Sequence, residues 1–167
     1  MRNILLVLAI LTTGLSAGVF YTWTVSVIPG LQVVSDKSYL ESMQSINRAI
    51  LNPWFFMAFM GAIPLVLFVT YVQFREGVNL SFWFMATTSI CYVLGTFAVT
   101  VFGNVPMNEA LDLVRLDELD AEGLKLARGM FEDKWNRLNM IRTIFSCISF
   151  GALILASVLR HAPIHKS

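Results

Sequence analysis

Four long apolar runs restrict the fold of this chain more than any other feature of its sequence. They cover residues 4–28, 54–74, 80–103 and 138–159. An α-helix of about 20 residues crosses the hydrocarbon core of a bilayer, so each run is long enough to span it. The runs are too long for barrel strands and lack sustained alternation, which favours helices whose backbone groups are all satisfied internally. The sequence therefore predicts an all-α, four-helix transmembrane bundle, with residues 1–167 as a single domain.

Composition supports a membrane setting and excludes some partners. The chain is 56% hydrophobic and 14% charged, whereas soluble domains average about 45–50% and 25%. A soluble domain of this size has too little interior to bury so much apolar surface. The net charge of +1 gives no basic face of the kind that nucleic acid requires. We expect membrane lipid as a partner and no nucleic acid.

The connections between the runs are unequal. Residues 75–79 form a tight turn, while residues 29–51 and 104–137 are long and share the other side of the membrane. The segment from Ser38 to Glu41 fits a capping box that opens a short amphipathic helix. Apolar residues recur every three or four positions from Leu124 to Leu138 and predict a helix that leads directly into the fourth span.

Local signals predict where helices begin and end. Asn52 reads as an N-cap followed by proline at the first helical position. Asp120 is a candidate cap for the helix that enters the fourth span. Gly103 and Pro106 predict that the third span ends near them, because both residues discourage further helix.

The distribution of charge predicts an orientation. The side with the termini and the short turn carries four basic residues against Glu76, a net charge of +3. The long-connection side carries seven basic and ten acidic residues, a net charge of −3, and Arg142 is the remaining charge. Basic residues close to the span ends in short loops orient a protein, and long acidic loops contribute little. We expect a multi-pass plasma-membrane protein with both termini in the cytoplasm.

Polar residues gather at the long-connection end of the predicted bundle. Trp135, Asn139 and Arg142 are separated by four and then three positions, which places them on one helical face. An arginine inside a span is costly and normally faces the bundle interior with a partner. Arg142 is the best candidate for a catalytic group. The candidate substrate-binding residues are Asn47, Arg48, Asn104, Asn108, Trp135, Asn139 and Arg142.

Structural alternatives compete for the same residues. Arg142 could extend to the lipid headgroups instead of facing inward. Asn104 and Asn108 could only stabilise a turn around Pro106, and Asn52 is more often a cap than a ligand contact. The nearby aromatic residues are either an ordinary interfacial belt or the walls of a site for a flat ligand. They are Phe20, Tyr21, Trp23 and Trp54.

The sequence offers little for metal or cofactor chemistry. His161 and His165 both lie in the C-terminal tail, so no histidine cluster is available for haem, zinc or di-iron within the bundle. Neither a glycine-rich phosphate loop nor a nucleophile elbow is present. We expect no metal and no cofactor. Glu41 and Glu109 are the acid/base candidates nearest the polar level, although both are more often solvated loop carboxylates.

Four pieces of the sequence occur in a recognisable order over nearly the whole chain: residues 17–20 with Pro29, residues 43–55, residues 104–108, and Trp135 through Asn139 to Arg142 and Thr143. Together they resemble the anthrone-oxygenase-like family of small four-helix membrane proteins. The second piece is long enough to be specific. The resemblance implies a four-helix fold. For some members it implies oxidation of an anthrone to an anthraquinone by O2 without a recognised cofactor, a reaction in which Arg142 could stabilise a phenolate.

Two functions remain open from the sequence. In the first, the polar residues bind a flat aromatic or quinone-like molecule at the outer end of the bundle, and the protein oxidises it with O2. In the second, the same residues form a structural hydrogen-bond network in a non-catalytic accessory or interaction protein, with a homo-oligomer as one possible state. A transporter is less favoured, because four spans without a midplane acidic residue or an evident repeat offer little for transport.

Overall fold

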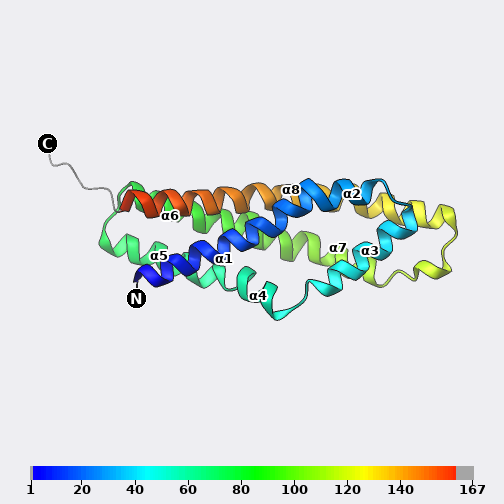
Figure 1. Ribbon diagram of the computed structural model, residues 1–167, viewed down its shortest axis with the longest axis horizontal. Helices are drawn as coiled ribbons and strands as arrows, with labels where there is room; N and C mark the ends of the chain where they lie inside the picture. The colour runs from blue at the N-terminus through cyan, green and yellow to red at the C-terminus, as the bar shows by residue number, and fades with distance from the viewer. Residues whose placement is uncertain (1, 161–167) are drawn as a thin grey trace.

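The computed structural model describes residues 2–160, which are almost entirely helical and contain no strand. Figure 1 shows one elongated bundle, with the N-terminus and the end of the last helix at the same end. The helical stretches of the described chain that are long and apolar enough to cross a membrane are Asn3–Gln32, Pro53–Glu76, Leu80–Asp112 and Ala121–Arg160. The predicted fold class, an all-α chain with four candidate membrane spans, is confirmed.

The first and second spans depart from single regular helices. The first comprises α1 (Arg2–Thr22), a π-helical turn η1 (Trp23–Val27) and α2 (Ile28–Gln32), so it continues past its predicted end at residue 28. The second is broken into α4 (Pro53–Phe59) and α5 (Ala62–Glu76). A Cβ atom on Gly61 would overlap the carbonyl oxygen of Met57, so the tight turn between α4 and α5 needs glycine.

The third span is longer than predicted. It comprises α6 (Leu80–Ile90), the π-helical segments η2 (Cys91–Ala98) and η3 (Thr100–Asn104), and α7 (Val105–Asp112). The prediction that it ends near Gly103 and Pro106 is wrong. Pro106 lies in the first turn of α7, directly after η3. A proline there gives up no required N–H, and a widened turn before it relieves the clash of its ring with the preceding carbonyl.

The connections contain the predicted amphipathic helices. In the first connection, α3 (Asp36–Ala49) is capped by Ser35, whose side chain accepts from the backbone N–H of Ser38. The predicted capping box beginning at Ser38 is therefore wrong by three residues, because Ser35 precedes it and offers the same hydroxyl. The third connection contains a 3-10 turn, η4 (Leu116–Glu118), and then α8 (Ala121–Arg160), which continues into the fourth span.

Two predicted caps are confirmed. Asn52 Oδ1 accepts from the Phe55 N–H at 3.0 Å, and Asp120 Oδ1 accepts from the Gly123 N–H at 2.8 Å. Both satisfy backbone donors that the first turn of a helix leaves unpaired. The Asn52 cap fixes the point at which the first long connection ends and α4 begins.

Two hydrophobic clusters stabilise the bundle. One lies among the spans and includes Phe20, Phe59, Val66, Tyr92 and Leu153. The other joins the long connections to α8 and includes Trp23, Tyr39, Met43, Phe131 and Trp135. Phe20 of the first cluster and Trp23 of the second are three positions apart on one face of the first span. The two clusters therefore meet at the level of these residues.

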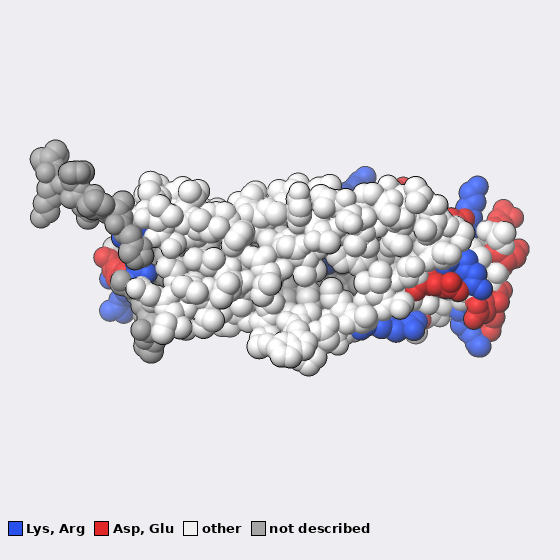
Figure 2. Space-filling view, in the orientation of Figure 1, with Lys and Arg blue, Asp and Glu red and all other residues white. Residues whose placement is uncertain are grey.

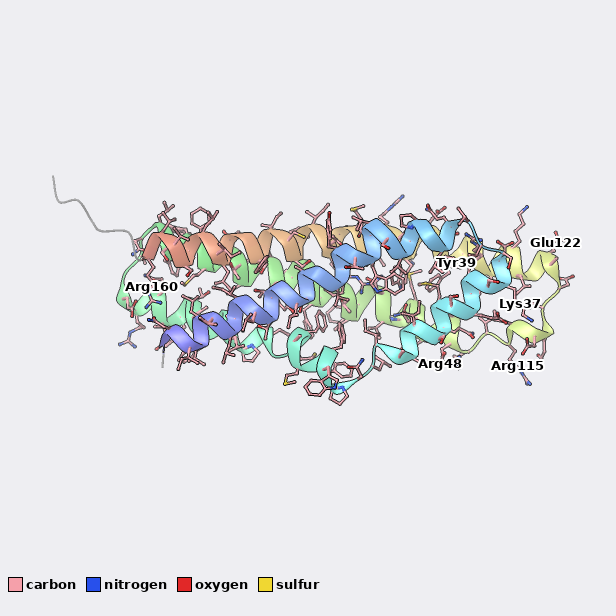
Figure 3. The ribbon with its side chains drawn as sticks, in the orientation of Figure 1. Lys37, Tyr39, Arg48, Arg115, Glu122 and Arg160 are labelled. Atoms are coloured by element: carbon pink, nitrogen blue, oxygen red, sulfur yellow. The ribbon has the colours of Figure 1, made fainter. Side chains whose placement is uncertain are left out.

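Charged side chains occupy the two ends of the molecule and leave an uncharged band between them (Figure 2). The 40 residues of α8 extend about 60 Å at 1.5 Å per residue, whereas the hydrocarbon core of a bilayer is about 30 Å thick. Figure 3 labels Lys37, Arg48, Arg115 and Glu122 toward one end and Arg160 at the other. About half of α8 therefore projects beyond the uncharged band, toward the long connections.

Candidate site beside a buried arginine

Arg142 lies inside the bundle, with 7% of its surface exposed. Its Nε and Nη2 donate to Asn139 Oδ1 at 3.1 and 2.9 Å. The guanidinium carbon also lies 4.6 Å from the centre of the Phe20 ring and 5.0 Å from that of Trp135. None of the ion pairs among the described residues includes Arg142. Arg142 therefore faces inward, stabilised by one amide oxygen and two aromatic rings rather than by a carboxylate.

Asn139 connects Arg142 to the first span. Asn139 Nδ2 donates to Thr24 Oγ1 at 2.9 Å, and the hydroxyls of Thr24 and Thr143 lie 3.0 Å apart. Thr143 Oγ1 also bonds to the Phe20 carbonyl oxygen at 3.1 Å. Sequence reasoning missed Thr24, because it lies in η1, where the π-helical turn shifts every side-chain direction that an α-helical projection assigns. Its position in an apolar run, at the level of the asparagines, was the only available signal.

Trp135 is hydrogen-bonded to two residues of the third span. Its Nε1–H donates to Asn108 Oδ1 at 2.7 Å, and Asn104 Nδ2 donates to the Trp135 carbonyl oxygen at 3.4 Å. Asn104 is fully buried, and its Oδ1 has no hydrogen-bond partner among the described residues. The asparagines do not stabilise a turn around Pro106, because η3 and α7 are continuous there. Asn104 and Asn108 instead join the third span to α8.

The remaining candidates lie nearer the long connections. Arg48 Nε pairs with Asp112 Oδ1 at 2.6 Å, and the Arg48 side chain is 61% exposed. The Arg48 charge is thus already paired at the surface. Asn47 differs from it, because its Nδ2 is buried and has no hydrogen-bond partner among residues 2–160. Asn52 acts as the cap of α4, as described above.

A cavity of about 180 Å³ lies beside Arg142. We call it the inner cavity. Its walls are mostly aromatic and aliphatic side chains, and the polar residues that line it are Asn47, Thr100 and Arg142. The aromatic lining comprises Phe20, Trp23, Phe55, Phe56, Phe59, Phe97 and Trp135. Of the four aromatic residues considered from sequence, Phe20 and Trp23 are walls of the cavity, whereas Tyr21 and Trp54 are 54% and 78% exposed.

A second hollow of about 350 Å³, the outer groove, adjoins the inner cavity and shares Asn47, Leu51 and Val105 with it. Its other lining residues are Arg48, Asn108, Glu109, Asp112 and Leu113. The two acid/base candidates are therefore separated. Glu109 lines the outer groove, and Glu41 lines a different surface hollow with Arg115 and Asp117.

Metal ligands do not gather at the site. Within residues 2–160, no group of three or more His, Cys, Asp or Glu side chains is placed to hold a metal ion. His161 and His165 lie outside the described residues. Cys91 and Cys147 are free thiols in separate spans, and neither lines the inner cavity. The described chemistry of the cavity is thus one cation, two uncharged polar side chains and aromatic faces.

Comparison with known proteins identifies one family. The family model described as "Anthrone oxygenase" matches residues 54–152. The match includes Asn104, Asn108, Trp135, Asn139 and Arg142, and it begins after Asn47 and Arg48. No curated protein and no solved structure matches the chain.

Proposed function

This chain belongs to the anthrone oxygenase family, and we propose that it binds a flat aromatic molecule with an ionisable hydroxyl in the inner cavity and oxidises it with O2. The observation that carries the proposal is the Arg142 guanidinium, which lines the cavity and lacks a carboxylate partner among the described residues. Burying a charge without an opposite charge is costly. A ligand that carries a negative oxygen into the cavity would offset that cost.

The lining of the cavity suits such a ligand. Aromatic walls bind a flat ring by stacking and edge contacts. Asn47 Nδ2 is a buried donor that has no hydrogen-bond partner in the described part of the chain, so a carbonyl or hydroxyl oxygen of the ligand would satisfy it. Arg142 is held in place by Asn139, which is itself bonded to Thr24. A cation fixed before the ligand arrives stabilises developing negative charge without reorganisation.

The reaction can be written for an anthrone. Loss of a proton gives an electron-rich anion, whose negative oxygen is stabilised by Arg142. The methylene carbon of the anion reduces O2 and forms a carbon–oxygen bond. Loss of water from the resulting hydroperoxide leaves a carbonyl group, so CH2 and O2 become C=O and H2O. The protein binds the ring, favours its ionised form and positions it.

We assign the role of proton acceptor to Glu109. Its carboxylate lines the outer groove, which adjoins the inner cavity. The other carboxylate of that groove, Asp112, is paired with Arg48, whereas Glu109 forms none of the ion pairs among the described residues. On this assignment, Glu109→Gln lowers the rate of oxidation while leaving binding of the quinone product unchanged.

Oxidation is tested with purified protein in nanodiscs, incubated with emodin anthrone under air, by the absorbance of the quinone. Arg142→Ala should slow quinone formation by roughly a hundredfold or more, the usual effect of losing a group that stabilises a developing oxyanion. Arg137→Ala is the matched control, because Arg137 lies on the same helix, is exposed and does not line the cavity. Equal rates for the native protein and Arg142→Ala would contradict the oxygenase proposal.

A second variant separates the ligand site from the structural network that the sequence left open. Val101 lines the inner cavity and makes no side-chain hydrogen bond. Val101→Phe should fill part of the cavity and weaken emodin binding at least tenfold, while the temperature of unfolding stays within a few degrees of native. If Val101→Phe leaves binding unchanged and Arg142→Ala only lowers stability, the network is structural and the ligand site is wrong.

A further inference from the structure

Resting on the proposed ligand site, we propose that the natural ligand is a membrane-dissolved amphiphile. Its ionised ring occupies the inner cavity, and an apolar substituent leaves the cavity beside α4 and remains in the lipid. The alternative is a ligand that enters from water and extends into the outer groove. Three observations favour entry from the lipid: the size of the cavity, the nature of its mouth and its depth along α8.

The inner cavity has room for a ring system and little more. Its volume is about 180 Å³, and a cavity of roughly 150 Å³ is already sufficient for benzene. One or two rings therefore fit beside Arg142, and the third ring of an anthrone would lie in the opening of the cavity. Any further part of the ligand has to leave through an opening in the wall.

The opening of the cavity is apolar. Of its lining residues, the exposed ones are Leu51, Phe56 and Met60, at 63%, 41% and 46%. All three lie on α4 or next to its ends. The neighbouring side chains of Trp54 and Met57 are also exposed, at 78% and 59%. Large apolar side chains gathered around an opening are expected to face lipid rather than water.

The cavity lies at a depth that lipid reaches. Arg160 is the last residue of α8, and Arg142 precedes it by 18 residues. At 1.5 Å per residue, the two lie about 27 Å apart along the helix. This distance falls within a hydrocarbon core about 30 Å thick, near its boundary.

The outer groove fits an apolar substituent less well. Arg48, Glu109 and Asp112 line it, and the Arg48–Asp112 pair is largely exposed. An alkyl chain placed there would have to leave the lipid. Each methylene moved from lipid to water weakens binding roughly fourfold, since the transfer costs about 0.8 kcal/mol. Tail length therefore distinguishes the two routes.

The test uses 2-hydroxy-1,4-naphthoquinone and its 3-alkyl derivatives with two to eight carbons. Native protein in immobilised nanodiscs is equilibrated with each compound, and retained quinone is quantified by chromatography after subtracting empty nanodiscs. Affinity is expressed against the mole fraction of compound in the bilayer. We expect affinities within threefold along the series, because the tail stays in lipid before and after binding. A loss approaching fourfold per methylene would overturn the proposal.

Variants locate the opening. Met60→Trp narrows the apolar mouth and should weaken binding of the octyl compound at least fivefold. Leu94→Trp is the matched control, because Leu94 is 63% exposed on another span and does not line the cavity. Weakening by Leu113→Trp, in the outer groove, without an effect of Met60→Trp would contradict entry from lipid. If Arg142→Ala binds every compound as well as native protein, the proposed site itself fails, which is a separate outcome from a steep dependence on tail length.

Discussion

Asn139 Oδ1 accepts hydrogen bonds from Nε and Nη2 of Arg142. Replacing Asn139 leaves a buried charge without its acceptor, whereas replacing Arg142 leaves an uncharged group, so the two losses of stability should differ. Asn139→Leu leaves a buried guanidinium without its amide acceptor, which costs about 3–5 kcal/mol when a buried charge loses its partner. Arg142→Leu leaves only a neutral amide oxygen unpaired, which costs about 1–3 kcal/mol.

The two substitutions should therefore be strongly non-additive. We expect the double variant Asn139→Leu/Arg142→Leu to unfold in detergent at a higher temperature than Asn139→Leu alone, because it removes the stranded charge. Thermal unfolding of the native protein, both single variants and the double variant measures the coupling. Additive losses would show that Arg142 is stabilised mainly by the rings of Phe20 and Trp135 rather than by Asn139.

Two buried tyrosines give a second comparison between single side chains. The Tyr39 hydroxyl, in the long-connection part of the molecule (Figure 3), is buried without a hydrogen-bond partner among the described residues, and burial raises the pKa of its phenol. The Tyr92 hydroxyl bonds to Ser16 Oγ and to the Phe59 carbonyl oxygen, both at 2.9 Å. Tyr39→Phe removes an unsatisfied group, while Tyr92→Phe removes satisfied bonds.

We expect Tyr39→Phe to leave the free energy of unfolding unchanged or raise it by up to about 1 kcal/mol, and Tyr92→Phe to lower it by about 1–2 kcal/mol. Both variants keep the ring and its packing, so the difference isolates the hydroxyl. Chemical unfolding in mixed micelles provides the measurement. A clear destabilisation by Tyr39→Phe would mean that its hydroxyl has a water partner.

Gly95, in a π-helical segment of the third span, allows this span to pack closely against α8. A Cβ atom on Gly95, in η2, would overlap the ring of Phe145 on α8. Gly95→Ala should lower stability by about 1–3 kcal/mol, the usual cost of overpacking. Gly151→Ala is the control, because Gly151 also lies in a span and nothing lies within 4 Å of its Cβ position. Unfolding temperatures in detergent compare the two, and equal values would show that Phe145 moves aside freely.

Some elements of the fold could be predicted from the sequence and others could not. Apolar length located all four spans, and the side-chain oxygens of Asn52 and Asp120 marked helix starts because a cap is a local interaction. The turn at Gly61 and the passage of the third helix through Pro106 were missed. The first depends on the close approach of Gly61 to the Met57 carbonyl oxygen and the second on the widened turn of η3, and neither has a distinct sequence pattern. Ser35 was missed as a cap, since Ser38 offered the same chemistry three residues later.

The sequence predicted how far along the bundle the candidate site lies, but not which side chains face each other there. A spacing of four and three residues placed Trp135, Asn139 and Arg142 on one face, and the structure brings these three together. Arg48 was grouped with them because it shares their depth, yet it pairs with Asp112 at the surface. Sequence patterns give depth along a helix; they do not show which way a side chain turns once long connections fold over the bundle.

The whole molecule is asymmetric along its length, and this asymmetry gives a prediction of topology. The long connections, α3 and the first half of α8 form a second hydrophobic cluster beyond the uncharged band, whereas the connection at the opposite end of residues 2–160 is a short turn between α5 and α6. We expect the large end to face outward and the short turn to face the cytoplasm, as the charge distribution indicates.

Cysteine labelling in intact cells checks this topology and the depth of the site together. In a Cys91→Ser/Cys147→Ser background, a membrane-impermeant maleimide should label Gly129→Cys, on the projecting half of α8, without permeabilisation. Val78→Cys, in the short turn, should be labelled only after permeabilisation, and Ile148→Cys, exposed in the uncharged band at 45%, in neither condition. Labelling of Val78→Cys but not of Gly129→Cys in intact cells would show that the orientation is the reverse of the one expected. The depth proposed for the inner cavity would be unchanged in that case, because it depends on the distance between Arg142 and Arg160 along α8 and not on which end faces outward.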